Sequence, residues 1–136
     1  MTSARWTFEV SREAPGQGRR AICEFVARAE PTAWALSAIG LCVTEAMTNV
    51  VVHAYQNGER PGRIEMDAEL DDTSLSVRVR DYGNGLRPRP DSPGLGLGLP
   101  LIIRMSARSE IRSPERGGTE ITMRFNVHEQ DEAVRP

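Results

Sequence analysis

The stretch RIEMDAELDDTSLSVRVRDYG, Arg63 to Gly83, decides the fold class. Apolar and polar residues alternate on both sides of the central DDT, which is typical of strands with one buried and one wet face. The residues expected on the buried faces are Ile64, Met66 and Ala68, then Leu75, Val77 and Val79. We therefore predict an antiparallel hairpin with one polar side.

Two helices are predicted before this hairpin. Apolar residues at helical spacing indicate the first, from about Gly18 to Ala29, and the second, from about Ala33 to Tyr55. Thr32 is the expected N-cap of the second helix, because it follows a proline that ends the first. The core stripe predicted for the second helix comprises Leu36, Ile39, Val43, Met47, Val50 and Ala54.

The flanking segments complete the pattern. We expect an initial strand at 5–10, a loop at 83–98, a helix at 99–108 with Pro100 in its first turn, and final strands at 109–113 and 119–127. The order β-α-α-β-β-loop-α-β-β predicts an α+β two-layer sandwich, with a mostly antiparallel, mixed sheet and helices on one face. We assign residues 1–128 to one domain and 129–136 to a flexible tail.

Composition narrows the class of function. The 136 residues carry a net charge of −2, and all 17 basic residues are Arg, interleaved with 19 acids. Aromatic residues make up only 5%. This composition does not favour a surface that follows a nucleic-acid phosphate backbone or stacks bases, so direct nucleic-acid binding is not expected.

The sequence also indicates the cellular compartment, because it lacks the features of membrane and exported proteins. It contains no run of 18 apolar residues and no apolar stretch at its start, so neither a membrane span nor a signal peptide is expected. Cys23 and Cys42 lack the spacing of metal ligands and are interpreted as buried free thiols in a reducing compartment. We expect a cytoplasmic protein.

Polar residues recur along one side of the second helix. Glu45, Asn49 and His53 are four apart and so lie in a row, turned away from the core stripe. Asn49 offers an oxygen to a hard divalent cation, and Glu45 could accept a proton from a hydroxyl. The alternative is a solvated face, with His53 in a structural hydrogen bond.

Three glycine motifs follow the hairpin. Asp81-x-Gly83-x-Gly85 could be a ligand clamp or a tight turn with a capping Asp. Gly94-x-Gly96-x-Gly98 precedes a helix, where backbone amides suit an anion, although a flexible connector fits as well. The last motif places Thr119 after two glycines at the start of a strand, which alone is an ordinary turn.

The order of these motifs resembles the GHKL (Bergerat-fold) nucleotide-binding superfamily. Within it, TEAMTNVVVHAY, residues 44–55, looks most like the RsbW-type anti-sigma-factor serine/threonine kinases. The resemblance covers nearly the whole chain, to about Val127, and implies ATP and Mg²⁺ as cofactors.

The resemblance also implies roles for these residues. Asn49 would coordinate the magnesium ion, and Glu45 would be the general base. Asp81 would accept a hydrogen bond from the adenine amino group, with support from Thr119. The glycines would let the backbone approach the nucleotide: Gly83 and Gly85 near the base, and Gly94, Gly96 and Gly98 near the phosphates.

The implied function is an anti-sigma factor and protein kinase. It would sequester a sigma factor and phosphorylate a Ser or Thr on an anti-anti-sigma (STAS) protein, and the family also suggests homodimerisation. One alternative is a partner-binding module that uses ATP without transfer. Another is a histidine-kinase catalytic domain, although no room for a dimerisation helix pair precedes Arg5.

The sequence departs from the family in the segment expected to form the lid. LRPRPDSP, residues 86–93, is short and rich in proline, and the chain has no Lys to grip phosphate. Arg87, Arg89 and Arg104 are the candidates for that contact.

Overall fold

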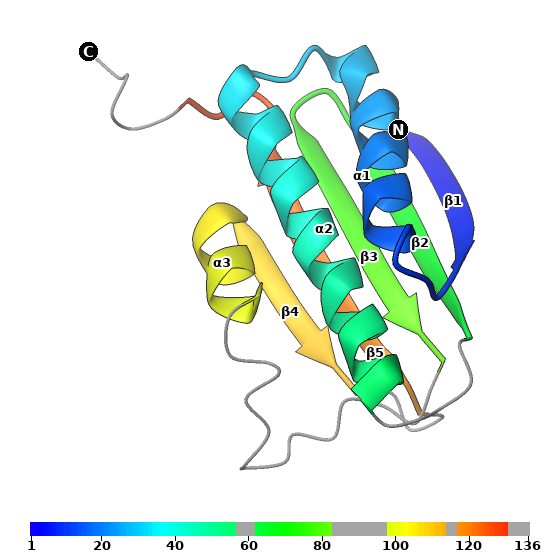
Figure 1. Ribbon diagram of the computed structural model, residues 1–136. Helices are drawn as coiled ribbons and strands as arrows, with labels where there is room; N and C mark the ends of the chain where they lie inside the picture. Colours follow the sequence, from blue (N-terminus) through cyan, green and yellow to red (C-terminus); the bar gives the residue numbers. More distant parts are fainter. Residues whose placement is uncertain (57–61, 83–97, 114–116, 131–136) are drawn as a thin grey trace.

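A five-stranded antiparallel sheet is covered on one face by helices in the computed structural model (Figure 1). The structure describes residues 1–56, 62–82, 98–113 and 117–130. Its elements are β1 (Thr2–Glu9), α1 (Ala14–Val26), the 3₁₀ turn η1 (Ala27–Ala29), α2 (Ala33–Gln56), β2 (Arg63–Leu70), β3 (Ser74–Asp81), α3 (Gly98–Met105), β4 (Arg108–Arg112) and β5 (Thr119–Asn126). The predicted element order and the two-layer α+β class are confirmed.

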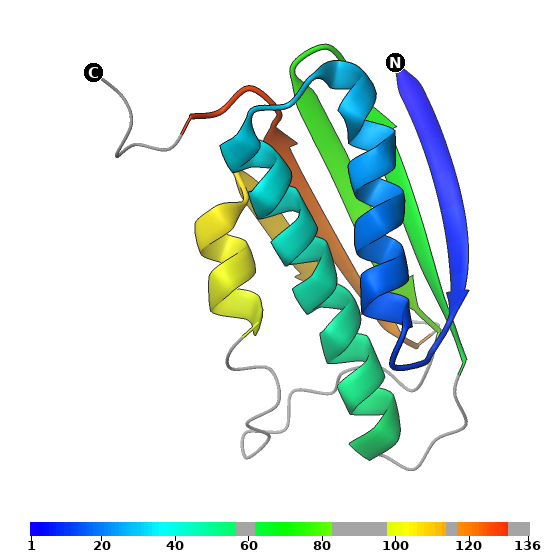
Figure 2. The same ribbon diagram turned by 45° about the horizontal axis from the view of Figure 1, so that its top comes forward.

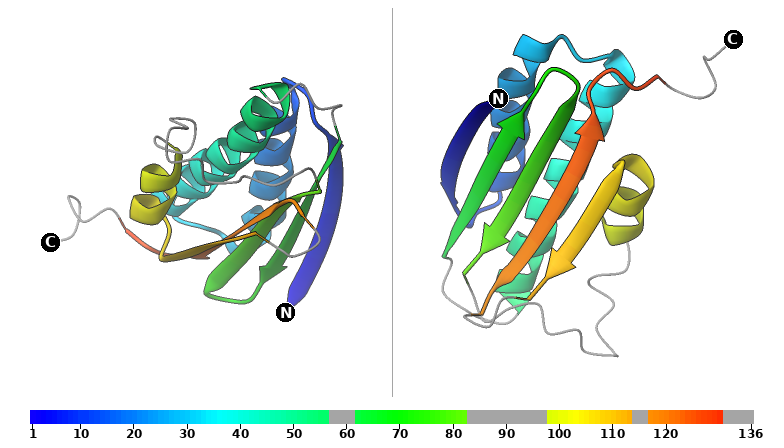
Figure 3. Two further views of the ribbon diagram at one scale, coloured as in Figure 1. Left: turned by 90° about the horizontal axis from the view of Figure 1, so that it is seen from below. Right: turned by 180° about the vertical axis from the view of Figure 1, so that it is seen from behind.

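The strand order in the sheet is β1-β2-β3-β5-β4, and each of these four pairings is antiparallel. The predicted mixed character of the sheet is therefore corrected for the described strands. The hairpin of β2 and β3 aligns Ile64 with Asp81 and Leu70 with Leu75, as the alternation required. Its apolar residues lie under the helices, while the other face of the sheet is open (Figure 2 and Figure 3).

Helix α2 lies over the middle of the sheet between α1 and α3 (Figure 1). Ile39, Val43 and Met47 are fully buried, which confirms that part of the predicted stripe. Leu36 is wrong as a core residue, because 37% of it is exposed. At about 100° per residue it lies about 60° from Ile39, at the border of the stripe. The side chain of the sixth member, Ala54, lies outside the described part.

The same helix is apolar enough to raise the question of a membrane. Residues 33–52 have a mean hydropathy of 1.6 and sufficient length to span a bilayer. Ser, Thr, Gly and one Glu interrupt this segment, so it contains no run of 18 apolar residues. In this fold the segment is the core helix, packed on the sheet and on both neighbouring helices.

Helix α1 begins at Ala14, four residues before its predicted start. Pro15 lies in the first turn, where a missing N–H costs no hydrogen bond. Gly18 packs directly on α2: a Cβ at this position would lie 2.1 Å from Sδ of Met47. The sequence PGQG therefore belongs to the helix, since its glycine allows close helix packing.

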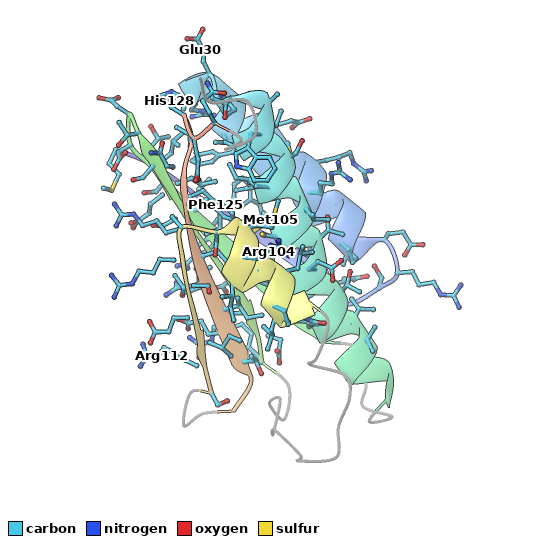
Figure 4. All side chains as sticks on the ribbon, turned by 90° about the vertical axis from the view of Figure 1, so that its left-hand side faces the viewer. Glu30, Arg104, Met105, Arg112, Phe125 and His128 are labelled. Carbon is cyan, nitrogen blue, oxygen red and sulfur yellow. The ribbon has the colours of Figure 1, made fainter. Side chains whose placement is uncertain are left out.

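The junction between α1 and α2 binds the segment that follows β5. Thr32 caps α2 by accepting a hydrogen bond from the Ala35 N–H at 3.1 Å, as predicted. The Thr32 backbone N–H donates to the Val127 carbonyl at 2.9 Å, and its hydroxyl donates to the Glu129 carbonyl. His128 lies close to the same junction (Figure 4), with Nε2 3.1 Å from the Ala29 carbonyl oxygen.

The turn between β2 and β3 is held by one carboxylate. Asp71 accepts hydrogen bonds from the backbone N–H groups of Thr73 at 2.9 Å and Ser74 at 2.7 Å, and from the Ser74 hydroxyl at 2.9 Å. These bonds, the Thr73 amide first, lower the pKa of Asp71 from 3.8 to about 2.

We expect Asp71→Ala to reduce stability in a pH-dependent way. A lowered carboxyl pKa stabilises the folded state fully above the unfolded value, and this stabilisation disappears as the pH falls through about 2. Thermal melting at several pH values should show the largest difference from the unsubstituted protein above about pH 4. Asp72→Ala is the control, because it removes the same charge but none of these hydrogen bonds. A constant difference down to pH 2 would contradict this account.

Candidate functional site

Several chain segments that carry predicted site residues reach the same end of the molecule. The C-terminal ends of α2 and β3 lie there with the N-terminal ends of α3 and β5 (Figure 1 and Figure 3). The antiparallel pairing of β3 with β5 accounts for part of this arrangement, because the end of one strand is then the start of the other.

Asp81 and Thr119 are brought together by that pairing. Asp81 is the last residue of β3, Thr119 is the first of β5, and their Cα atoms are direct partners. Both side chains face the helices, with exposures of 7% and 1%. They are the buried polar residues of the described chain. A buried carboxylate beside a buried hydroxyl, among apolar side chains, suits recognition of a hydrogen-bond donor.

Two glycines allow this close approach. Gly117 and Gly118 have φ values of 90° and 87°, in the region that residues with a side chain rarely adopt. A Cβ on Gly118 would lie 2.1 Å from the Asp81 carbonyl oxygen and 3.2 Å from the Tyr82 Cα. In the sequence these two glycines indicate only a turn. Their contact with β3 depends on the strand register, which local sequence does not reveal.

Glu45 and Asn49 lie one turn apart on α2, and both are half-buried. The Asn49 Nδ2 atom is buried and has no hydrogen-bond partner among the described residues. A buried polar atom in this condition calls for a missing water, ion or ligand. Rotating the amide would put Oδ1, a metal-binding oxygen, at that position instead. The donor chemistry of this helix side therefore fits a hydrated cation or a phosphate oxygen.

The structure describes only some of the remaining predicted site residues. Gly98 is the first residue of α3, and Arg104 is an exposed residue of its last turn (Figure 4). His53 belongs to α2, but its side chain lies outside the described part of the chain. The residues wholly outside it are Gly83, Gly85, Arg87, Arg89, Gly94 and Gly96.

The two cysteines are free thiols, as expected, but only Cys42 is buried, and Cys23 is half-buried. Burial, with a smaller contribution from the Glu45 carboxylate, raises the pKa of Cys42 to about 12. Cys42 is therefore a neutral thiol at physiological pH and belongs to the core. No group of three or more potential metal-binding side chains of the His, Cys, Asp or Glu type occurs in the described ranges.

These features define a two-layer α+β domain with a polar site at one end of its sheet. Residues 8–125 match the family described as the histidine kinase-like ATPase domain. The chain belongs to this family, and membership implies ATP binding. The predicted GHKL resemblance is thereby confirmed.

Curated relatives agree with this assignment. The chain is 28% identical over 122 residues to an anti-sigma F factor of Clostridium beijerinckii, an alignment that covers 80% of this chain and 85% of the relative. It is 29% identical over 116 residues to the anti-sigma F factor of Pasteuria penetrans, with 77% of each chain covered.

Solved structures show the same fold. A structure of the RsbU and RsbW domains of Rv1364c from Mycobacterium tuberculosis matches 96% of this chain with a TM-score of 0.73 and 20% identity. The match spans only 34% of that longer chain. A structure of the SiaB–SiaC complex from Pseudomonas aeruginosa matches with a TM-score of 0.62 and 14% identity, covering 88% of each chain.

Proposed function

We propose that this chain is an ATP-dependent anti-sigma factor and protein serine/threonine kinase. It would sequester a sigma factor and phosphorylate an anti-anti-sigma protein of the STAS type, in the cytoplasm of a bacterium. The observation that carries the proposal is the buried Asn49 amide without a described partner, one helical turn from Glu45. The names of the anti-sigma F factor relatives support the choice of partners.

The nucleotide would be held by groups at both sides of the site. Asp81, with Thr119 beside it, would accept a hydrogen bond from the adenine amino group, and Asn49 would provide an oxygen to magnesium. The magnesium ion, when bound, neutralises charge on the phosphates. Gly98 at the start of α3 presents its backbone toward the phosphates, near the positive end of the helix dipole. Catalysis of this kind rests on positioning and charge stabilisation.

Glu45 would supply the general base that phosphoryl transfer requires. Its carboxylate lies one turn before Asn49, so it can accept the proton of an incoming Ser or Thr hydroxyl as the oxygen attacks the terminal phosphate. A module that only binds ATP needs the nucleotide clamp but no base. The half-buried carboxylate on the same helix side as Asn49 is therefore the observation that favours transfer.

Nucleotide binding is the first test of this site. We expect Asp81→Asn and Asn49→Ala each to weaken Mg·ATP binding by about tenfold or more. Asp81→Asn replaces a charged hydrogen-bond acceptor with a weaker neutral one, and Asn49→Ala removes a polar contact, both in a desolvated site. Isothermal titration calorimetry with Mg·ATP measures both. Thr122→Ala, on the open face of the sheet, is the control and should bind as the unsubstituted protein does. Unchanged Mg·ATP affinity in both variants would show that the proposed site does not bind the nucleotide.

Transfer is tested with labelled ATP, Mg²⁺ and purified STAS proteins. Label on a Ser or Thr of the STAS protein supports the kinase. ATP binding without transfer to any of them would overturn the kinase and leave an ATP-dependent binding module. Label on a His of a partner would instead indicate a histidine-kinase-like domain.

A further inference from the structure

The open face of the sheet is a network of charges that is balanced over most of its area. On β1, β2 and β3 the Asp67 carboxylate lies between two guanidinium groups and binds both Arg5 and Arg78. Between β3 and β5, Arg80 pairs with Glu120 at 3.7 Å. Opposite charges thus face one another across neighbouring strands, which stabilises a wet sheet face.

One corner of this face breaks the rule. Arg108 of β4 and Arg124 of β5 are direct partners in the strand register, so two like charges stand side by side. Both are exposed, and neither forms an ion pair with any described residue. Among the described residues, the Arg124 guanidinium donates one hydrogen bond, to the Ser74 hydroxyl at 3.4 Å. Like charges directly opposite each other destabilise a sheet, so this corner lowers the stability of the free protein.

The uncompensated corner lies on a free strand edge. β4 is the last strand of the sheet, and no described element pairs with its outer side. The second arginine of β4, Arg112, lies on the same open face as Arg108, four residues along the strand, in register with Glu120 (Figure 4). On the opposite face Ile111 is 42% exposed. An edge strand of this kind accepts an added strand through its backbone groups.

We propose that the β4 edge binds an extended acidic segment of a partner protein by strand addition. Carboxylates on one side of the added strand would lie opposite Arg108 and Arg112 of β4, with Arg124 one strand farther in. Apolar side chains on its other side would cover Ile111. Guanidinium groups bind carboxylates in a fixed, bidentate geometry, which gives this corner its specificity. The recognised sequence therefore has carboxylates opposite the two arginines of β4, a neutral residue opposite Glu110 and apolar residues on its other side.

A nucleic acid is the less suitable occupant. The chain carries a net charge of −2, and Asp67, Glu69 and Glu110 lie on the same sheet face. A continuous phosphate backbone would meet those carboxylates, whereas a short acidic peptide need reach only the arginine corner. The proposal does not depend on the nucleotide site, so it can be tested without ATP.

Charge reversal separates stability from binding here. We expect Arg108→Glu to raise Tm by about 2–4 °C, because it replaces a like-charge pair with an opposite-charge pair. The same substitution should weaken peptide binding by at least about tenfold. Arg63→Glu is the matched control, since it makes the same charge change at an exposed residue of β2. A Tm that falls in Arg108→Glu would show that the corner is not strained by its charges and would overturn the premise.

Binding is measured by NMR titration of the full chain with acetyl-Glu-Val-Gln-Val-Glu-amide, whose Gln lies opposite Glu110 when its two Glu residues lie opposite Arg108 and Arg112. We expect amide shifts concentrated on β4 and β5, and affinity at least about tenfold weaker in Arg108→Glu, while Arg63→Glu binds as the unsubstituted protein does. The peptide with Gln in place of each Glu should not bind. The proposal is overturned by equal binding of the Gln peptide, by equal losses in both variants, by shifts elsewhere, or by no binding. Inorganic phosphate or duplex DNA producing the same shifts at lower concentration would also overturn it.

Discussion

We expect Glu45→Gln to lower the rate of phosphoryl transfer by a factor of about 10²–10⁴ while leaving Mg·ATP affinity within about twofold. Gln keeps the size and the oxygen of Glu but cannot accept a proton at neutral pH. If Asn49, Asp81 and Thr119 hold the nucleotide, the loss should appear in the chemical step alone. The measurement is single-turnover transfer to a saturating STAS protein, with calorimetry for ATP.

The control for this prediction is Glu24→Gln, an exposed acid on α1 that makes the same change in charge. It should transfer phosphate at the unsubstituted rate. Full activity in Glu45→Gln would exclude the carboxylate as the base. A parallel loss of ATP binding would assign Glu45 to the nucleotide clamp rather than to proton transfer.

The hairpin and the core helix could be predicted because their information is local. Alternation across 63–83 specified β2 and β3 to within two residues, and the stripe through Ile39, Val43 and Met47 specified the buried side of α2. The side of α2 that carries Glu45 and Asn49 followed from the same periodicity. None of these inferences required information about which segments lie next to one another in the fold.

The features that escaped prediction are non-local. The insertion of β5 between β3 and β4 makes Thr119 the partner of Asp81 and Arg108 the partner of Arg124. No pattern within one segment specifies such pairings. The start of α1 escaped for a related reason, because Gly18 is explained by Met47 on another helix and not by the turn that PGQG resembles.

Strand pairing also explains why Thr119 could not be identified as a site residue from its own segment alone. In sequence it follows two glycines, which is ordinary for a turn. In the structure the two glycines have positive φ, and the turn places Thr119 against the end of β3. The two glycines and Thr119 therefore act together: the glycines let the start of β5 approach the end of β3 closely, and this places Thr119 beside Asp81.

We accordingly expect Gly118→Ala to destabilise the protein by about 3 kcal/mol or more and to lower Tm by roughly 10 °C. Two penalties combine: a side chain at a φ of 87°, and a Cβ placed 2.1 Å from the Asp81 carbonyl oxygen. Backbone cannot yield as the tip of a flexible side chain does, so β5 must move away from β3 at this end. Urea denaturation and thermal melting measure the loss.

Gly62→Ala is the matched control, because a Cβ there would have no neighbour within 4 Å. It should change stability little or raise it slightly, by restricting the unfolded chain. Moving β5 also separates Thr119 from Asp81, so Mg·ATP affinity of the folded Gly118→Ala protein should fall by about tenfold. A destabilised variant with normal ATP affinity would show that the glycine maintains the sheet alone and that Thr119 takes no part in nucleotide binding.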